Sequence, residues 1–296
     1  MKCRMFSPKE SKTGWFFILP QFLVFVIFYF YPIVEGFRLS LYNVTAKSTS
    51  FIGFGNYVEL FADPVFHTAV KNTLIYVVVI VSMTIGFGLF VASAVFDKRP
   101  GYVSFIRGCY YLPYMVSMVV MAMVWNFLLN PANGLVCYIL RQMGCQTVNL
   151  LGNKATVLPV IIFVTFVFNA GQAIILFIAA MLGVSADMLE AAEIDGANRL
   201  KRIWHIVIPS IQSTMLYVTV INIIGVLKMF VAVQLLTAGG PNNASTTIMY
   251  YLYKNAFTFS RTGYSSAVGV IMFLIAIIML IPMFHALGSS EKRKGS

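Results

Sequence analysis

The sequence predicts an all-α membrane protein with six transmembrane helices and a pair of short helices on the cytoplasmic side. Of its 296 residues, 59% are hydrophobic and only 10% are charged, whereas soluble domains carry about 25% charged residues. Six apolar stretches are each long enough to cross a bilayer, which takes roughly 20 residues. Backbone groups in lipid must bond within their own segment, so we expect every span to be a helix.

The first apolar stretch differs from a secretory leader. It is long enough to span a bilayer and lacks a small-x-small cleavage pattern, so we interpret it as a retained helix. The later stretches are separated by polar connections rich in Gly, Pro, Asn and Ser, which are typical of turns. The six predicted spans lie near residues 15–34, 73–96, 108–129, 155–181, 210–236 and 264–287.

Lysines and arginines predict the orientation. They concentrate at both chain ends and in the connections near 98–107 and 199–202, and they are sparser in the alternate connections. The positive-inside rule therefore places both termini and residues 185–209 in the cytoplasm. The predicted divisions are a cytoplasmic tail (1–14), a first transmembrane helix (15–34), an outer loop (35–72), a five-helix core (73–287) and a second cytoplasmic tail (288–296).

The densest polar segment of the chain is 185–209. Acidic residues come first, which suits the positive end of a helix, and Ser185 can cap that helix by accepting backbone hydrogen bonds. Gly196 is the expected stop. Pro209 fits the opening turn of the next span. Between them we expect an amphipathic helix, with bases on one side and an apolar face of Leu200, Ile203, Trp204 and Val207.

By spacing alone, this segment could be a plain solvated loop helix. The identities of its residues are more specific. They resemble the EAA motif of permease subunits in binding-protein-dependent ABC importers, with Glu190-Ala191-Ala192 followed by Gly196, Ile206 and Pro209. The resemblance implies the type I ABC importer permease fold, with this segment docking on a separate ATPase subunit. The coupling residues it implies are Glu190, Ala191, Ala192, Gly196, Ala197, Trp204, Ile206 and Pro209.

Three further stretches resemble the first permease subunit of maltose- and lactose-type carbohydrate importers. They are Phe51–Tyr57, Asn72-Thr73-Leu74 and Leu236–Pro241, although Phe230-Val231 stands where that class often has Phe-Asp. The resemblance implies a heterodimer with a second permease, two copies of an ATPase subunit and an extracytoplasmic solute-binding protein, in a bacterial or archaeal cytoplasmic membrane. ATP and Mg would be used by the ATPase, and we expect this chain to bind no cofactor.

Spans four and five carry the candidate solute-binding residues. Polar side chains at mid-membrane face other protein or water-filled space. The amides Asn169 and Gln172 are three residues apart, as are Asn222 and Gly225, so each pair should share a helical face, which Met229 extends. These positions match those that line the sugar site in the maltose-type subunit. The predicted set is Phe168, Asn169, Gln172, Asn222, Gly225 and Met229; alternatively, Gln172 and Asn222 only join helices.

Three side chains leave alternatives open. Lys228, inside span five, either faces an aqueous path, a partner chain or a carbonyl, or snorkels toward the membrane surface. Cys137 and Cys145 share one outer loop and either pair or remain thiols. Trp125 is expected to be an interfacial anchor rather than a ligand contact.

Other functions lack the residues they need. The sequence has no phosphate-binding G-x-x-x-x-G-K-[ST] loop, and its histidines show no metal-ligand spacing. The bases behind the net charge of +11 flank apolar spans, so nucleic acid is not an expected partner. An ion-coupled secondary transporter is the main rival, but we find neither internal repeats nor midplane carboxylates. We therefore expect a transport subunit without catalysis, for a sugar or alternatively a polyol or glycerol phosphate.

Overall fold

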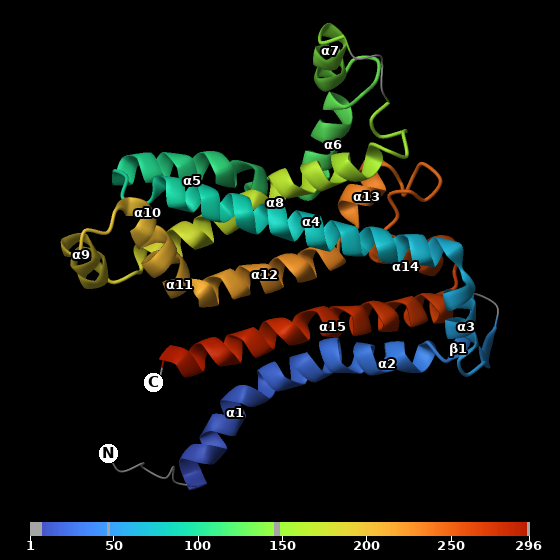
Figure 1. Cartoon of the computed structure of the whole chain (residues 1–296). Helices are drawn as coiled ribbons and strands as arrows, with labels where there is room; N and C mark the ends of the chain where they lie inside the picture. The colour runs from blue at the N-terminus through green and yellow to red at the C-terminus, as the bar shows by residue number, and fades with distance from the viewer. Residues whose placement is uncertain (1–7, 46–47, 145–148, 295–296) are drawn as a thin grey trace. The chain divides into compact units, whose positions relative to one another are not determined.

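The computed structural model describes residues 8–45, 48–144 and 149–294. Within these residues the regular secondary structure is helical except for a single hairpin of β1 (Tyr42–Val44) and β2 (Thr49–Phe51), paired antiparallel (Figure 1). It divides into two compact units. Unit 1 comprises Met1–Ala62 and Leu252–Ile271, and unit 2 comprises Asp63–Tyr251 and Met272–Ser296.

Unit 1 begins with a continuous helical run. It consists of α1 (Pro8–Phe25), the π-helical turn η1 (Val26–Phe30) and α2 (Tyr31–Leu39). Among the described residues, none buries the apolar window of this run, so these side chains are available to lipid or to another subunit. The unit also contains α3 (Gly55–Ala62), η3 (Lys254–Thr258) and the first part of α15 (Thr262–Lys294).

The Phe51–Tyr57 stretch closes the hairpin of unit 1 onto α3. The buried amide of Asn56 donates to the carbonyls of Ser40 and Tyr42, at 2.7 and 3.0 Å. The hydroxyls of Tyr57 and Ser40 are also hydrogen-bonded, at 2.7 Å. Polar groups buried in this way are stable only when paired, which explains why Asn and Tyr stand at these positions.

Unit 2 is built on two long helices that lie side by side, α4 (Pro64–Val95) and α8 (Val157–Leu182) (Figure 1). Helices α5 (Pro100–Met115) and α12 (Gln212–Leu227) pack against them. Gly171 allows α8 to approach α5 closely, because a Cβ there would lie 2.1 Å from the carbonyl oxygen of Tyr110. A close approach of this kind between helices is typical of membrane proteins.

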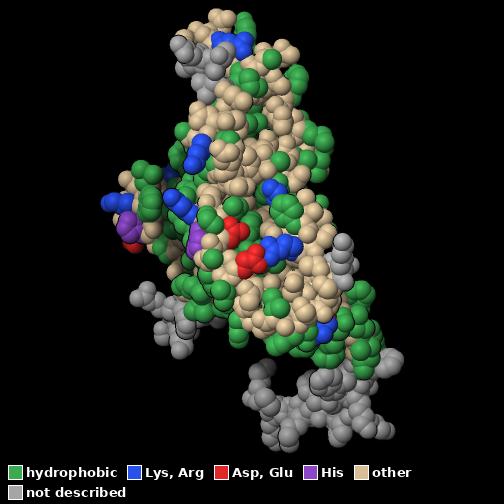
Figure 2. Space-filling view, turned by 90° about the vertical axis from the view of Figure 1, so that its right-hand side faces the viewer, with side chains coloured by type: hydrophobic (Ala, Val, Ile, Leu, Met, Phe, Trp, Pro, Cys, Tyr) green, Lys and Arg blue, Asp and Glu red, His purple; other side chains and the backbone are tan. Residues whose placement is uncertain are grey.

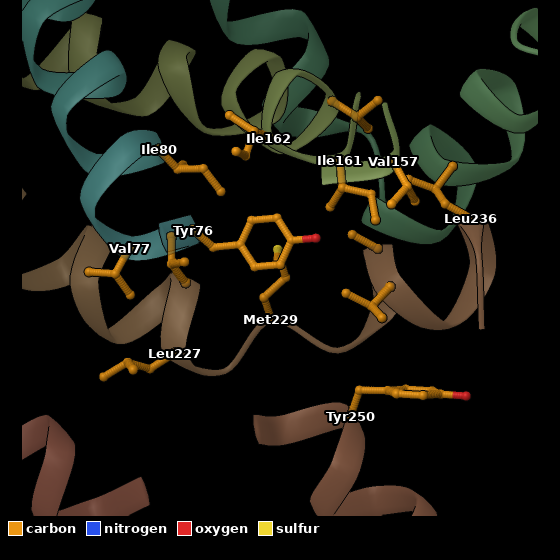
Figure 3. Close-up of a cluster of buried hydrophobic side chains, with 14 of the residues drawn as sticks. Tyr76, Val77, Ile80, Val157, Ile161, Ile162, Leu227, Met229, Leu236 and Tyr250 are labelled. Atoms are coloured by element: carbon orange, nitrogen blue, oxygen red, sulfur yellow. The ribbon is translucent and has the colours of Figure 1, made fainter. Parts of the chain in front are cut away.

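Two buried hydrophobic clusters follow the α4–α8 pair. One surrounds Tyr76, Ile161 and Met229 (Figure 3), and the other surrounds Ala92, Phe177 and Val207. Many other large apolar side chains reach the surface, and hydrophobic groups cover much of the face in Figure 2. Such a surface is unsuited to water and suits lipid and subunit contacts.

The structure supports four to six membrane spans. In the described part of the chain, four helical segments are long and apolar enough to cross a membrane, and two bent helix pairs raise this to six if each is one span. The four are Phe17–Leu39, Pro64–Val95, Val157–Leu182 and Thr262–Met283. The predicted tails, outer loop and sidedness remain predictions.

The predicted third span, 108–129, lies in a bent pair of helices. The chain bends by 91° between α5 and α6 (Met118–Leu128). Val116 is extended, and the side chain of Ser117 caps α6 by accepting from the N–H of Val119. Pro113 also removes a backbone donor from the last turn of α5. A single N-cap residue such as Ser117 starts a new helix but hardly changes the mean hydropathy of the apolar stretch, so hydropathy does not indicate the bend.

The predicted fifth span, 210–236, is interrupted as well. A bend of 65° precedes α12, and α12 ends at Leu227. The chain resumes as α13 (Val231–Leu236), followed by a loop and α14 (Ile248–Tyr253).

The loop after α6 carries α7 (Leu135–Gln142), where the thiol of Cys137 donates to the carbonyl of Leu129. Cys145, its possible disulfide partner, lies outside the described residues.

Candidate functional site

A cavity of about 320 Å³ lies in unit 2 between α8, the end of α12 and the segment that follows α12. All six candidate solute-binding residues line it. The sequence separates them into two groups that are far apart in the chain, and the fold brings the groups to one place. Other lining residues include Tyr114, Lys228 and Phe230.

Helix α8 contributes Phe168, Asn169 and Gln172, all half-buried. The ring of Phe168 packs against that of Tyr114, with centroids 5.5 Å apart. In the described ranges, no side-chain hydrogen bond joins Asn169 or Gln172 to another helix. Their amides therefore present both donors and acceptors to the cavity.

The α12 side is shaped by a broken helix. Asn222 is buried, and its amide donates to the carbonyl of Val218 in the same helix at 2.8 Å. Gly225 is exposed, and a Cβ there would meet nothing within 4 Å. The argument that Met229 extends the face of Asn222 and Gly225 was wrong, because α12 ends at Leu227. Met229 lines the cavity from the break itself.

Met229 is held tightly on both sides. Its side chain is 7% exposed and belongs to the cluster around Tyr76 (Figure 3). The hydroxyl of Thr165, on α8, donates to its sulfur at 3.5 Å. Met229 thus presents a small apolar surface to the cavity.

Lys228 stands directly beside the break. Its backbone N–H closes the last turn of α12 by donating to the carbonyl of Ile224, while its side chain is exposed and lines the cavity. Of the alternatives raised by the sequence, this placement agrees with an aqueous path. Trp125, the expected interfacial anchor, packs edge-on against Phe163 with ring centroids 5.5 Å apart, and its interfacial position stays a prediction.

The break is held by the loop between α13 and α14. Thr247 donates to the carbonyl of Met229 at 3.0 Å and accepts from the N–H of Tyr250. Within the loop, the hydroxyls of Thr237 and Ser245 bond at 2.8 Å, and Ser245 also donates to the carbonyl of Gly240. These bonds order a segment in which Ala238, Gly239, Asn242 and Asn243 all have left-handed backbones.

Helix α4 anchors the same loop. The buried amide of Asn72 donates to the carbonyls of Ala244 and Thr246, at 2.8 and 3.1 Å. Its neighbour Thr73 accepts from the N–H of Ile248 at 3.0 Å. The sequence marked Asn72-Thr73-Leu74 and Leu236–Pro241 only as family features, and it missed that these stretches together support the cavity. Thr247 was missed altogether.

The segment at 185–209 forms short helices, as predicted. They are α9 (Ala186–Ile194), α10 (Arg199–Arg202), the π-helical turn η2 (Ile203–Val207) and α11 (Ile208–Ser210). Gly196 ends α9 with a left-handed φ of +78°. Ser185 was wrongly expected to cap α9 through its side chain, which makes no capping bond, whereas Asn198 does cap α10. Pro209 lies inside the helical run that ends at Ser210, before α12 begins.

One side of this segment is apolar and exposed. Ile203 and Val207 are buried, but Leu200 and Trp204 are each 66% exposed, so the predicted apolar face is split between core and surface. Ile194 is 87% exposed. Among the implied coupling residues, Glu190, Ala191, Gly196, Trp204 and Pro209 are exposed and Ala192, Ala197 and Ile206 are half-buried. A small, exposed apolar surface of this kind is typical of a subunit interface.

Two arginines point inward instead of to solvent. Arg199 donates to three carbonyls at the end of α4, those of Ser93, Ala94 and Phe96, at 2.7 to 3.0 Å. Arg202 pairs with Glu193 at 2.9 Å and with Asp97 at 3.3 Å. The sequence predicted bases opposite the apolar face but gave them no partners. The last turn of a helix leaves carbonyls without intrahelical donors, which explains the contacts of Arg199.

Comparison with known proteins gives a family. The model of the binding-protein-dependent transport system inner membrane component matches residues 84–288. The chain belongs to this family of ABC importer permeases. The match includes the cavity, the coupling segment and the Leu236–Pro241 loop.

Two relatives and one solved structure match this permease over nearly their whole length. It is 33% identical to the probable ABC transporter permease YurN of Bacillus subtilis, over 93% of this chain and 96% of YurN. It is 30% identical to the sn-glycerol-3-phosphate permease UgpA of Agrobacterium fabrum, over 90% and 92%. A bacterial alginate ABC transporter, solved with an alginate pentasaccharide-bound periplasmic protein, matches with a TM-score of 0.81 and 26% identity over 94% of each chain.

The family assigns the permease to the cytoplasmic membrane as a multi-pass component that is not itself catalytic. The family assignment also excludes the ion-coupled secondary transporter, the main rival that the sequence left open. In the described ranges, no three His, Cys, Asp or Glu side chains are grouped as metal ligands would be. The chemistry that its cavity offers is therefore recognition by hydrogen bonds, apolar surface and one positive charge.

Proposed function

We propose that this permease forms, with a second permease, the path for a sugar delivered by an extracytoplasmic binding protein. The carrying observation is the single cavity that gathers Phe168, Asn169, Gln172, Asn222, Gly225 and Met229. Its volume of about 320 Å³ lies at the small end of the range for ligand sites, roughly 300–1,000 Å³. The second permease would complete the enclosure.

The lining suits a hydroxyl-rich ring. Amides can both donate to and accept from hydroxyl groups, so Asn169 and Gln172 can bind sugar hydroxyls in either sense. Phe168 and Met229 supply the apolar surface that a ring face needs. Asn222 keeps its carbonyl oxygen for a ligand while its N–H₂ also bonds Val218. This reading keeps the heterodimer and two ATPase copies that the sequence motifs imply.

The coupling segment supports the same assembly. Its exposed apolar side chains and small Ala191 would dock in a groove of the ATPase, with both chain termini on that cytoplasmic side. The related alginate transporter is described with its periplasmic binding protein, which supports a third partner here. UgpA supports a second candidate substrate, a glycerol phosphate, and Lys228 in the cavity favours it.

The test is reconstitution of the complex with its co-encoded partners in proteoliposomes. Native mass measurement should give two different permeases and two ATPase copies. When a panel of labelled sugars is offered together with the binding protein, ATP should drive the uptake of at least one of them. A transport-competent homodimer of this chain would contradict the heterodimer. Uptake that leaves a Cys placed at Gly225 fully reactive, with no protection by solute, would contradict the proposed path.

A further inference from the structure

Lys228 is a charged side chain with no counter-ion in its own spans. It is exposed and lines the cavity. The sequence has no Asp or Glu between residues 98 and 186 or between 196 and 290, nor between 64 and 96. The ion pairs of the described ranges all lie elsewhere, at Arg38, Arg202 and Arg261. The cavity therefore carries a net positive charge from this chain.

A charge in such a place has a strong effect. Charge interactions are stronger where protein and lipid replace water, because the effective dielectric constant is lower. The polar neighbours Asn169, Gln172 and Asn222 are neutral and can add hydrogen bonds without cancelling the charge. An anion entering this cavity is attracted, and a cation is repelled.

Lys228 could instead have a structural role at the end of α12, and that role has a different consequence. Lysine at the C-terminal end of a helix is favoured by the negative end of the helix dipole, and Lys228 ends α12. That role needs a charge near the helix end but sets no condition on the solute. Lys228 also lines the cavity, which a role as a helix cap does not require.

We propose that Lys228 makes this permease selective for solutes that carry a carboxylate or a phosphate group, such as uronate-containing sugars or phosphorylated polyols. The proposal rests on the proposed function, in which the cavity lies on the solute path. Lys228 would bind the anionic group, while the amides and Phe168 bind the hydroxyl-rich part.

The first experiment measures the charge without knowledge of the solute. In the assembled complex in nanodiscs, the four cysteines are changed to Ser and Gly225 is changed to Cys, where a side chain meets nothing within 4 Å. Reaction rates are measured with an anionic sulfonatoethyl and a cationic trimethylammonioethyl methanethiosulfonate. We expect Lys228→Gln to lower the anionic-to-cationic rate ratio by about tenfold.

Matched variants control for folding and for surface charge. Lys228→Arg should keep the ratio within about twofold, and Lys154→Gln, which removes an exposed lysine outside the cavity, should leave it unchanged. Ile221→Cys, also in the lining, gives a second reporter if Gly225→Cys fails to assemble. A ratio that does not respond to Lys228→Gln at either reporter would show a neutralised charge and overturn the proposal.

The second experiment identifies the anion. Labelling of the reporter by uncharged methyl methanethiosulfonate is measured with galacturonate against galactose, and with sn-glycerol 3-phosphate against glycerol. Protection at least threefold stronger by either anion than by its neutral counterpart, lost in Lys228→Gln, supports the proposal, and the protecting anion separates carboxylate from phosphate. Equal protection by galactose would keep the sugar path but overturn the charge selectivity. No protection by any of the four would overturn both.

Discussion

The hydroxyl of Thr247 donates to the backbone carbonyl of Met229 at 3.0 Å. Both residues are buried, and they come from opposite ends of the segment that carries α13. Helix α12 ends at Leu227, so this carbonyl has lost the partner that a continuous helix would provide. A threonine remote in sequence thus stabilises the break that shapes the cavity.

Removing this hydroxyl should destabilise the cavity. Thr247→Val keeps the shape of the side chain but leaves the Met229 carbonyl buried without its bond, at a cost of about 1–3 kcal/mol. We expect a lower midpoint in thermal unfolding of the purified complex and reduced uptake. Thr247→Ser, which retains the hydroxyl, should restore both. Equal stability of the Val and Ser variants would mean that the bond does not hold the break.

Gly196 should be intolerant of side chains. Its φ of +78° lies in the left-handed region, where a β-branched residue is strained by at least about 1–2 kcal/mol. Gly196→Val should therefore weaken co-purification of the ATPase and abolish transport while the chain still inserts. Gly183→Ala is the matched control, because its φ is −84° and its Cβ would meet only ordinary contacts. Normal transport by Gly196→Val would exclude the docking role.

Arg199 should be needed for coupling. The Nη2 nitrogen of its guanidinium lies within 3.0 Å of three carbonyls at the end of α4, and Met has no donor that could replace it. We expect Arg199→Met to keep ATP hydrolysis by the complex but to lower the solute transported per ATP at least threefold. Lys201→Met, a neighbouring exposed base, should change this ratio little. An unchanged ratio in Arg199→Met would show that the contact is dispensable.

The cavity amides should affect transport and not assembly. Gln172→Ala and Asn222→Ala should each lower uptake at least tenfold, since each removes hydrogen-bonding groups from the solute site. Basal ATP hydrolysis and subunit stoichiometry should stay intact. Thr219→Ala, on α12 but outside the lining, should transport normally. Disassembly of the Gln172 or Asn222 variant would mean that these residues only hold helices together.

The sequence predicted the positions of the spans, the stop at Gly196 and the residues that meet at one cavity. Hydropathy and helical spacing are local properties, so they indicated the spans and the stop, whereas the cavity residues also rested on the resemblance to the maltose-type subunit. The bend at Val116 and the end of α12 at Leu227 were missed, because a window of mean hydropathy does not register where one apolar helix ends and another begins. The inward turn of Arg199 was missed because it depends on carbonyls that are distant in sequence.

Helix α4 is joined to other parts of unit 2 towards both of its ends, once by Arg199 and once by two of its own side chains. At one end Arg199 holds its last carbonyls, and at the other Asn72 and Thr73 hold the loop that carries Thr247. The helix is unbroken over 32 residues, which corresponds to about 48 Å. An intact helix resists stretching along its axis, so α4 can act as a rod. A displacement of the coupling segment would be transmitted along α4 and through the loop to the Met229 carbonyl. The timing of ATP hydrolysis and of solute release would then be set by one stiff element.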